Sequence, residues 1–337
     1  MELILVHREE FLHYYNCDYK TDEEWWAEGV VNIPFGYYSI SVGILYLSLY
    51  IPCLLVMKQA DLYKLSCFKI MFALGIVDCC SVLINCIYSG VMSVLGGVAC
   101  PNIEFHYMIG GISIGNHTNL QVHTYRSVAI YAFQCSMCVI LALNRCFDLW
   151  TWEAPRALFA GHRTYFWIAL CGLYMLCVLW YGRGCEFSSK AYGFFFDPYF
   201  GMNVGPKNRD YYEGYLMYVN NICAITFLIT IYTFLLLSLR WKWRQLNPEK
   251  LSKLQFQILL TAVTICFLTF VSAAVYIYMQ FFYTPLWLIM GAQITWQSST
   301  GGAVFTYLAL NQTICQRVLF LVSGTRRLFA STTVSPQ

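Results

Sequence analysis

Charged side chains are scarce in this sequence of 337 residues. They make up 12% of the chain, whereas apolar residues make up 58%. A soluble domain has about 25% charged residues, so the surface of this protein cannot lie mostly in water. The composition therefore excludes an ordinary soluble domain and predicts an integral membrane protein.

Motifs of the common chemistries are also missing. The sequence contains no P-loop, no complete zinc-ligand spacing, no GxSxG element and no nucleic-acid-binding motif. Cys135 and Cys138 have the spacing of half a metal site, but no second pair accompanies them, and we interpret them as packing residues. We therefore expect no catalytic residue, no metal, no cofactor and no nucleic-acid partner.

The sequence shows no cleavable signal peptide either. The apolar stretch at residues 3–6 is too short for one, and charged residues follow it directly. Residues 1–35 hold eight of the eighteen acidic residues, which predicts a polar N-terminal segment. The first membrane span is then expected to direct the chain to the membrane.

Successive apolar runs with short links fill most of the remaining chain. A helix needs roughly 20 residues to cross a bilayer. The predicted fold is an all-α membrane protein, a seven-transmembrane helix bundle at residues 36–310 followed by a tail at 311–337. The spans are expected at about residues 36–57, 68–95, 105–143, 164–182, 214–239, 256–282 and 285–310.

The third span is irregular because a polar insert at residues 116–126 divides it. Neither half reaches the length that a crossing requires, if the second half ends near Leu143. Either the insert bulges out as a loop or the outer half of the helix is displaced. Asn116 begins an Asn-x-Thr sequon and is a glycosylation candidate if the insert is extracellular.

Basic residues are distributed unequally between the two sides of the predicted bundle. Fourteen Lys and Arg residues fall in or beside the loops after spans one, three and five and in the tail, against six on the other side. The positive-inside rule therefore predicts an extracellular N-terminus and a cytoplasmic C-terminus. It also places Arg145 at the cytoplasmic end of span three.

This arrangement matches the general plan of a G-protein-coupled receptor. An Arg closes span three on the inner side, and a basic loop at residues 240–253 joins spans five and six. The loop is expected to contact a G protein or anionic membrane lipids. Arg145 has a second interpretation, as a membrane anchor that binds lipid phosphate.

Several short motifs in one order make the comparison more specific. They are Tyr15-Asn16-Cys17 with Glu24-Trp25, LYIPCL at 49–54, CFKIM at 67–71 with LGIVD at 74–78, LALNRC at 141–146 and YLALNQTI at 307–314. Together they resemble the nematode serpentine receptor class T family. The resemblance implies a chemosensory-type receptor of the plasma membrane, in sensory neurons or their cilia, that couples to a heterotrimeric G protein. The insert departs from the family pattern, in which span three is unbroken.

Two groups of polar residues are expected inside the membrane. Asp78 lies near the midplane, where a charge is costly unless it is paired. We expect a switch role for it beside Asn85 and either Tyr307 or Asn311, or else a packing role. The G-protein-side candidates are Asn144, Arg145, Cys146, Asp78 and Asn311.

The middle of span seven is rich in polar residues. Such groups either line a cavity or form hydrogen bonds between helices. We expect a small-molecule ligand in the outer half, among spans three, five, six and seven. The pocket candidates are Gln293, Trp296, Gln297, Asn220 and Asn221.

Three cysteines are predicted to lie outside the cell, where disulfides form. Cys100 and Cys185 are the best-placed pair, and a bond between Cys17 and Cys185 is the competing connectivity. The sequence as a whole favours a receptor that performs no covalent chemistry. A membrane transporter and a ligand-gated channel subunit are the alternatives.

Overall fold

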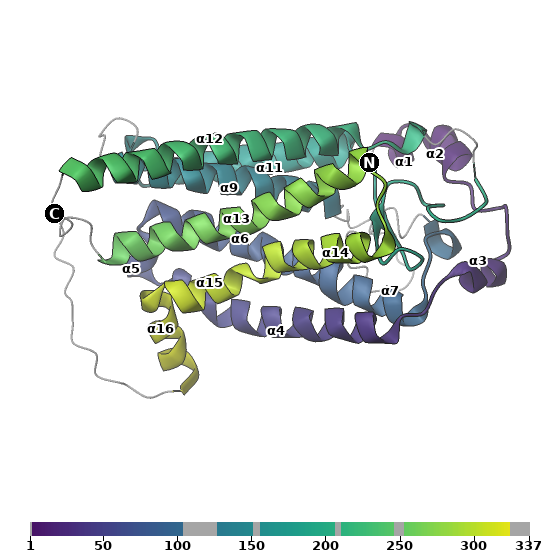
Figure 1. Ribbon diagram of the computed structural model, residues 1–337, viewed down its shortest axis with the longest axis horizontal. Coiled ribbons are helices and arrows are strands. Elements are labelled where there is room, and N and C mark those ends of the chain that lie inside the picture. The colour runs from purple at the N-terminus through teal and green to yellow at the C-terminus, as the bar shows by residue number, and fades with distance from the viewer. Residues whose placement is uncertain (1, 104–126, 151–155, 206–209, 246–252, 324–337) are drawn as a thin grey trace.

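The computed structural model describes residues 2–103, 127–150, 156–205, 210–245 and 253–323. Long helices run side by side along the longest axis of the molecule (Figure 1). Among the described residues, six helical segments are long and apolar enough to cross a membrane. They are Ile33–Met57, Ser66–Leu95, Val128–Asp148, Arg163–Tyr181, Tyr215–Ser238 and Gln257–Met279.

The long helices follow the order of the predicted spans. The first is α4 (Ile33–Met57), and the second consists of α6 (Ser66–Val82), the π-helix η1 (Leu83–Tyr88) and α7 (Ser89–Leu95). They are followed by α9 (Ser127–Trp150), α11 (Arg163–Tyr181), α12 (Tyr215–Gln245) and α13 (Lys253–Phe281). The predicted seventh span corresponds to α14 (Leu286–Gly301) and α15 (Ala303–Leu310), which are separated at Gly302.

The third span differs from the expectation at its C-terminal end. Helix α9 does not end at Leu143 but continues to Trp150. Its 24 residues correspond to about 36 Å of helix, which exceeds the hydrocarbon thickness of a bilayer. The charge of Arg145 is accommodated within the helix because Asp148 pairs with it one turn later. The polar insert and Asn116 lie outside the described residues.

Helix α9 is the central helix of the bundle. In the apolar window of this helix 83% of the residues are buried, against 22% in the window of α11. The main hydrophobic cluster includes Tyr50 of α4, Phe68 of α6, Leu141 of α9 and Tyr307 of α15. Helix α11 therefore lies at the periphery, where its apolar side chains are left for lipid.

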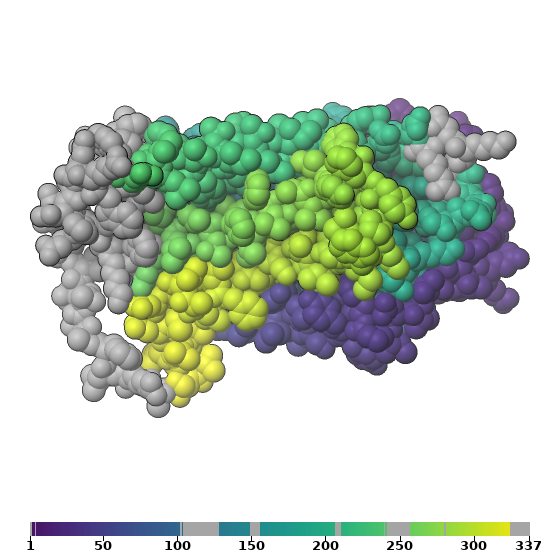
Figure 2. All heavy atoms as spheres, in the orientation of Figure 1, coloured from purple at the N-terminus to yellow at the C-terminus, as the bar shows by residue number. Residues whose placement is uncertain are grey.

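Short elements cover the two ends of the bundle. Helices α1 (Glu2–Leu5), α2 (Arg8–Tyr14) and α3 (Asp22–Glu28) lie at one end, which we call the N-terminal end, together with η2 (Cys100–Asn102) and η3 (Asp210–Tyr212). A hairpin of β1 (Glu186–Ser188) and β2 (Gly193–Phe195) pairs Phe187 with Phe194 at this end. The opposite end carries α5 (Ala60–Tyr63) and α16 (Gln312–Ser323). In Figure 2 the yellow C-terminal residues lie at the end of the molecule opposite the purple residues of α3.

Close packing between α4 and α14 depends on Gly301. A Cβ atom added to this residue would lie 1.8 Å from Cδ2 of Tyr46. We expect Gly301→Ala to lower the free energy of unfolding by about 1–3 kcal/mol, because the ring and the helix must separate. Gly291→Ala is the matched control on the same helix, since a Cβ there meets nothing within 4 Å. Thermal melting of the two purified variants checks this prediction, and equal melting temperatures would contradict it.

Candidate functional site

A cavity of about 60 Å³ lies between α9, α12, α13 and α14, with Phe194 of β2 in its wall. These helices are the predicted spans three, five, six and seven. No charged side chain is among the described residues that line the cavity. The lining residues are Val128, Tyr131, Cys185, Phe194, Phe196, Met217, Tyr276 and Trp296.

Trp296 is the pocket candidate that lies in the wall of this cavity. Its ring makes edge-to-face contacts with Tyr131, Phe194 and Tyr276, at centroid distances of 6.3, 5.4 and 6.2 Å. Such contacts stabilise aromatic pairs beyond their buried area. The ring is therefore held at the junction of α9, α13, α14 and the hairpin. The indole Nε1–H has no acceptor among the described residues.

Gln293 and Gln297 do not line the cavity, because their amides bind the second span instead. The Nε2 atoms of both donate to the carbonyl oxygen of Asn85, each at 2.8 Å. Gln297 Nε2 also lies 3.1 Å from Oγ of Ser39 in α4. Asn85 belongs to η1, and a π-helical turn alters the backbone bonding so that a carbonyl can accept from outside the helix. The two glutamines thus join α14 to η1.

Asn220 and Asn221 of α12 also lie outside the cavity lining. Asn220 accepts a hydrogen bond of 3.1 Å from the hydroxyl of Tyr174 in α11. Its Nδ2 lies 3.5 Å from Oδ1 of Asn221. Both residues are buried, so these contacts connect α11 and α12 close to the cavity. Their role in ligand binding stays a prediction.

Asp78 is fully buried at the centre of the bundle, and its nearest polar partner is Tyr50 of α4. The Tyr50 hydroxyl lies 3.0 Å from Asp78 Oδ2 and 2.6 Å from the carbonyl oxygen of Thr300. A hydroxyl has one proton, so Tyr50 shares it between Asp78 Oδ2 and the carbonyl oxygen of Thr300. Asn85 bonds to Oγ1 of Thr300 at 2.9 Å. Thr300 thus links the Asp78 pair to the η1 contacts.

Arg145 lies toward the end of the bundle opposite the N-terminal end. It is buried, with 6% of its surface exposed. Its Nη2 lies 2.6 Å from Oδ2 of Asp148, and it also donates to Oδ1 of Asn144. Asn144 in turn donates to Oγ of Ser66 at 2.9 Å. The guanidinium is therefore bound by protein groups and not extended toward lipid. The lipid-anchor interpretation is not needed to explain its position.

The other two candidates at this end make structural contacts. Cys146 is buried, and its Sγ lies 3.9 Å from the carbonyl oxygen of Ile231 in α12. Oδ1 of Asn311 accepts from the backbone N–H of Ile314 at 3.2 Å and so caps α16. Arg317 of α16 forms an ion pair with Asp61 of α5, which fixes the two short helices against each other.

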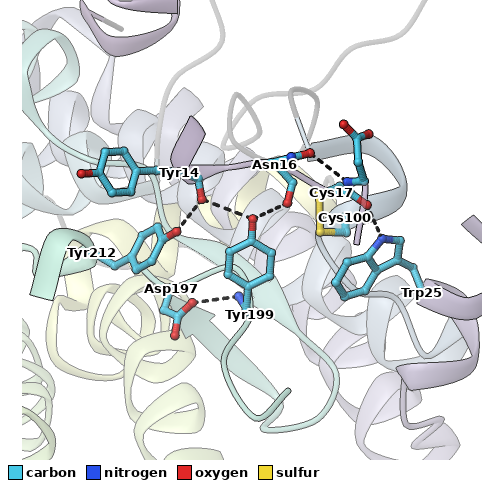
Figure 3. Close-up of a disulfide and its surroundings, with 9 residues drawn as sticks. Tyr14, Asn16, Cys17, Trp25, Cys100, Asp197, Tyr199 and Tyr212 are labelled. Carbon is cyan, nitrogen blue, oxygen red and sulfur yellow. Dashed lines mark hydrogen bonds between the residues drawn. A yellow bond between two sulfur atoms is a disulfide. The ribbon is translucent and has the colours of Figure 1, made fainter. Parts of the chain in front are cut away.

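The disulfide expectation was wrong, because Cys100 is bonded to Cys17 and not to Cys185. Figure 3 shows the disulfide with Trp25 on one side and Tyr199 on the other. The indole of Trp25 donates to the carbonyl oxygen of Cys17 at 2.8 Å, and the hydroxyl of Tyr199 donates to the carbonyl oxygen of Tyr14 at 3.2 Å. A hydrophobic cluster fixes the segment and brings the two sulfurs together. It contains Phe11, Tyr15, Trp25, Val98, Cys100, Tyr199, Met202 and Tyr212.

A charged contact joins the same segment to the hairpin. Glu28, the last residue of α3, forms ion pairs with Lys190 in the hairpin turn and with Lys20. The hydrogen bond from Lys190, followed by that from Lys20, lowers the pKa of Glu28 from 4.5 to about 2. The backbone N–H of Val30 also donates to Oγ of Ser189 at 3.1 Å.

This contact predicts a pH dependence of stability. Because the folded pKa of Glu28 lies below its ordinary value of 4.5, its contribution is complete above that pH and is lost as the pH falls toward about 2. We expect the wild type to melt at a higher temperature than Glu28→Gln at neutral pH. This difference in melting temperature should vanish as the pH approaches about 2. Glu23→Gln, on the exposed side of α3, is the control. A difference between wild type and Glu28→Gln that stays constant over this range would contradict the prediction.

Sequence reasoning missed three partners that the structure places at these sites. Tyr50 contacts Asp78 from another helix, and no local signal joins the two. Cys17, which the sequence offered only as a partner of Cys185, pairs with Cys100 across 83 residues of sequence. Asp148 could have been found, because a residue at position i+3 faces Arg145 on the same side of a helix.

Comparisons with known proteins agree with this architecture. The curated relative "Serpentine receptor class T-55" of Caenorhabditis elegans is 23% identical over 317 residues, which cover 93% of this chain and 81% of that protein. The crystal structure of squid rhodopsin superposes with a TM-score of 0.57 at 14% identity, covering 93% of this chain and 90% of the other. At such low identity the rhodopsin match shows the fold alone, a seven-transmembrane bundle.

A family model covers nearly the whole sequence. Residues 1–328 match the model described as "Serpentine type 7TM GPCR chemoreceptor Srt". This match includes the bundle, the cavity and the N-terminal segment. The chain therefore belongs to the serpentine 7TM GPCR chemoreceptor family Srt, a family of multi-pass membrane receptors.

Proposed function

We propose that this protein is a chemosensory-type receptor that binds a small molecule in the cavity beside Trp296 and activates a heterotrimeric G protein. Its N-terminus would face the outside of the plasma membrane, with sensory-neuron cilia as the expected site. The observation that carries the proposal is the cavity, which lies among α9, α12, α13 and α14. Membership of a chemoreceptor family supports the same function.

A chain of polar contacts leads from the cavity wall to Asp78. Trp296 stands in the cavity wall, and Gln297, the next residue of α14, binds η1. Thr300 follows one turn later and contacts both Asn85 and Tyr50. A ligand that prefers one position of α14 would therefore shift the partners of Asp78. Such a preference is the only way in which binding can change the equilibrium between conformations.

At the inner end, the shift would change how α9 meets α12 and α13. Cys146 contacts Ile231, and Cys138 lies 3.4 Å from Thr269 of α13. Movement of α12 and α13 relative to Arg145 would open a site for the G protein. The receptor performs no bond-breaking step in this scheme.

The test is Gα-dependent signalling in cells that express the chain. The cells are screened with a library of small neutral molecules while second messengers and membrane conductance are both recorded. The proposal expects second-messenger changes that disappear when Gα is removed, and no conductance of the chain itself. A ligand-evoked current that persists without Gα would favour a channel instead, and net uptake of the molecule would favour a transporter. Epitope tags at the two ends must also be found on opposite sides of the intact cell.

A further inference from the structure

We propose that Gln293 and Gln297 are positioning residues for the ligand cavity, although neither lines it. They hold η1 of the second span in its π-helical form, and η1 in turn holds Phe194 of the cavity wall in place through Tyr88. The inference rests on the proposed function, because it assigns to these residues the shape of the proposed ligand site.

The π-helical turn removes the backbone donor of one carbonyl group. In an α-helix the N–H of Ser89 would donate to the carbonyl oxygen of Asn85, four residues earlier. Here that N–H donates to the carbonyl oxygens of Ile84 and Cys86 instead. Asn85 is fully buried, so its carbonyl oxygen needs donors from elsewhere if the turn is to be stable.

Side chains supply these donors, and two of them come from α14. The Nε2 atoms of Gln293 and Gln297 each lie 2.8 Å from the carbonyl oxygen of Asn85. The hydroxyl of Ser89 donates to the same oxygen at 2.5 Å. A carbonyl oxygen has two lone pairs, so three donors share two places. The turn should therefore tolerate the loss of one glutamine but not the loss of both.

The two amides stabilise η1 at a cost to their own oxygens. Oε1 of Gln293 and Oε1 of Gln297 are buried and have no hydrogen-bond partner among the described residues. A buried acceptor without a donor is destabilising, and a leucine of similar size would avoid this penalty. We therefore expect the pair to act by binding η1 and to contribute little to the stability of the bundle as a whole.

An aromatic contact joins η1 to the cavity. Tyr88, the last residue of η1, has its ring centroid 6.3 Å from that of Phe194 in β2. Phe194 lines the cavity, and its ring contacts that of Trp296 at a centroid distance of 5.4 Å. A change in the position of η1 is therefore transmitted to the cavity wall.

The test uses the purified receptor in lipid nanodiscs, without ligand or G protein. The variant Gln293→Leu with Gln297→Leu is compared with the wild type by hydrogen–deuterium exchange of peptides that cover residues 83–90. Exchange there should become faster by about tenfold, because the turn loses two hydrogen bonds. Each single variant should show a much smaller change, since two donors remain for the two lone pairs. The melting temperature should change little, because the two unpaired oxygens are removed as well.

A second measurement reports on the cavity itself. Met217 lines the cavity, so the NMR signal of its ¹³C-labelled methyl group, assigned with Met217→Leu, is sensitive to the surrounding rings. This signal should move in the double variant. Gln134→Leu is the matched control, because it removes a buried amide whose hydrogen bond goes to Ser299 of α14, and it should leave exchange at residues 83–90 unchanged. Gln293→Met with Gln297→Met replaces the leucine pair if that pair does not fold.

Three results would overturn the inference. Unchanged exchange at residues 83–90 in the double variant, or an equal rise in Gln134→Leu, would show that the glutamines do not hold η1. Exchange that rises equally in all spans would show a general loss of stability instead. Faster exchange in η1 with an unmoved Met217 signal would show that the turn does not act on the cavity. None of these results bears on coupling to a G protein, which is measured separately as ligand-evoked nucleotide exchange.

Discussion

Arg145→Ala is expected to abolish ligand-evoked nucleotide exchange on a partner Gα while the receptor still reaches the cell surface. The guanidinium is buried against Asp148 and Asn144 at the end of α9, where a G protein would bind on the proposed orientation. A coupling free energy of about 1–3 kcal/mol corresponds to a 5- to 150-fold effect of the ligand, and its loss would leave exchange at the rate without ligand. The measurement is GTP-analogue binding to Gα with surface-labelled receptor counted in the same cells.

Folding should tolerate this change. Removal of one partner from a buried ion pair usually costs about 3–5 kcal/mol, because the other charge is left unpaired. Here Asp148 is partly exposed and also lies 3.7 Å from Nε of Arg156, so its charge stays compensated. Arg163→Ala, at an exposed position of the same end, is the control and should leave exchange unchanged. Normal exchange by the Arg145 variant would reject the role assigned to this residue.

Cys17→Ser is expected to produce the largest loss of stability among the single changes at the N-terminal end. The bond to Cys100 joins two residues that are 83 positions apart in the sequence. A disulfide across a loop of this length contributes about 4 kcal/mol, mainly by restricting the unfolded chain. Thermal melting should show the loss, and the N-terminal segment should become more accessible to protease.

Cysteine variants also distinguish the possible connectivities. Cys100→Ser should lower stability as much as Cys17→Ser, and the double variant should be no worse, because both changes remove one bond. Cys185→Ala should have an effect below about 1 kcal/mol, since that residue is not in the disulfide. A large effect of Cys185→Ala together with a silent Cys17→Ser would show that the bond forms as the sequence first suggested.

The polar residues of span seven show which features of the cavity can be predicted from sequence. Polar residues in span seven indicated that this helix faces the interior, and Trp296 does lie in the cavity wall. Gln293 and Gln297 have the same spacing and polarity, yet they bind Asn85 in η1. The difference arises because η1 presents a carbonyl oxygen to α14, and a π-helical turn leaves no clear mark in the sequence.

The sequence by itself determined the class of the protein and the positions of its helices. Low charge and long apolar runs act locally, since each span must bury its own backbone in lipid whatever its neighbours do. Family motifs such as LALNRC at 141–146 added the receptor assignment, which the family match confirms. Tertiary structure alone decided the pairing of Cys17 with Cys100, of Tyr50 with Asp78 and of Glu28 with Lys190. These contacts join residues far apart in the chain, and only the packing of the N-terminal segment and the helices brings their side chains within bonding distance.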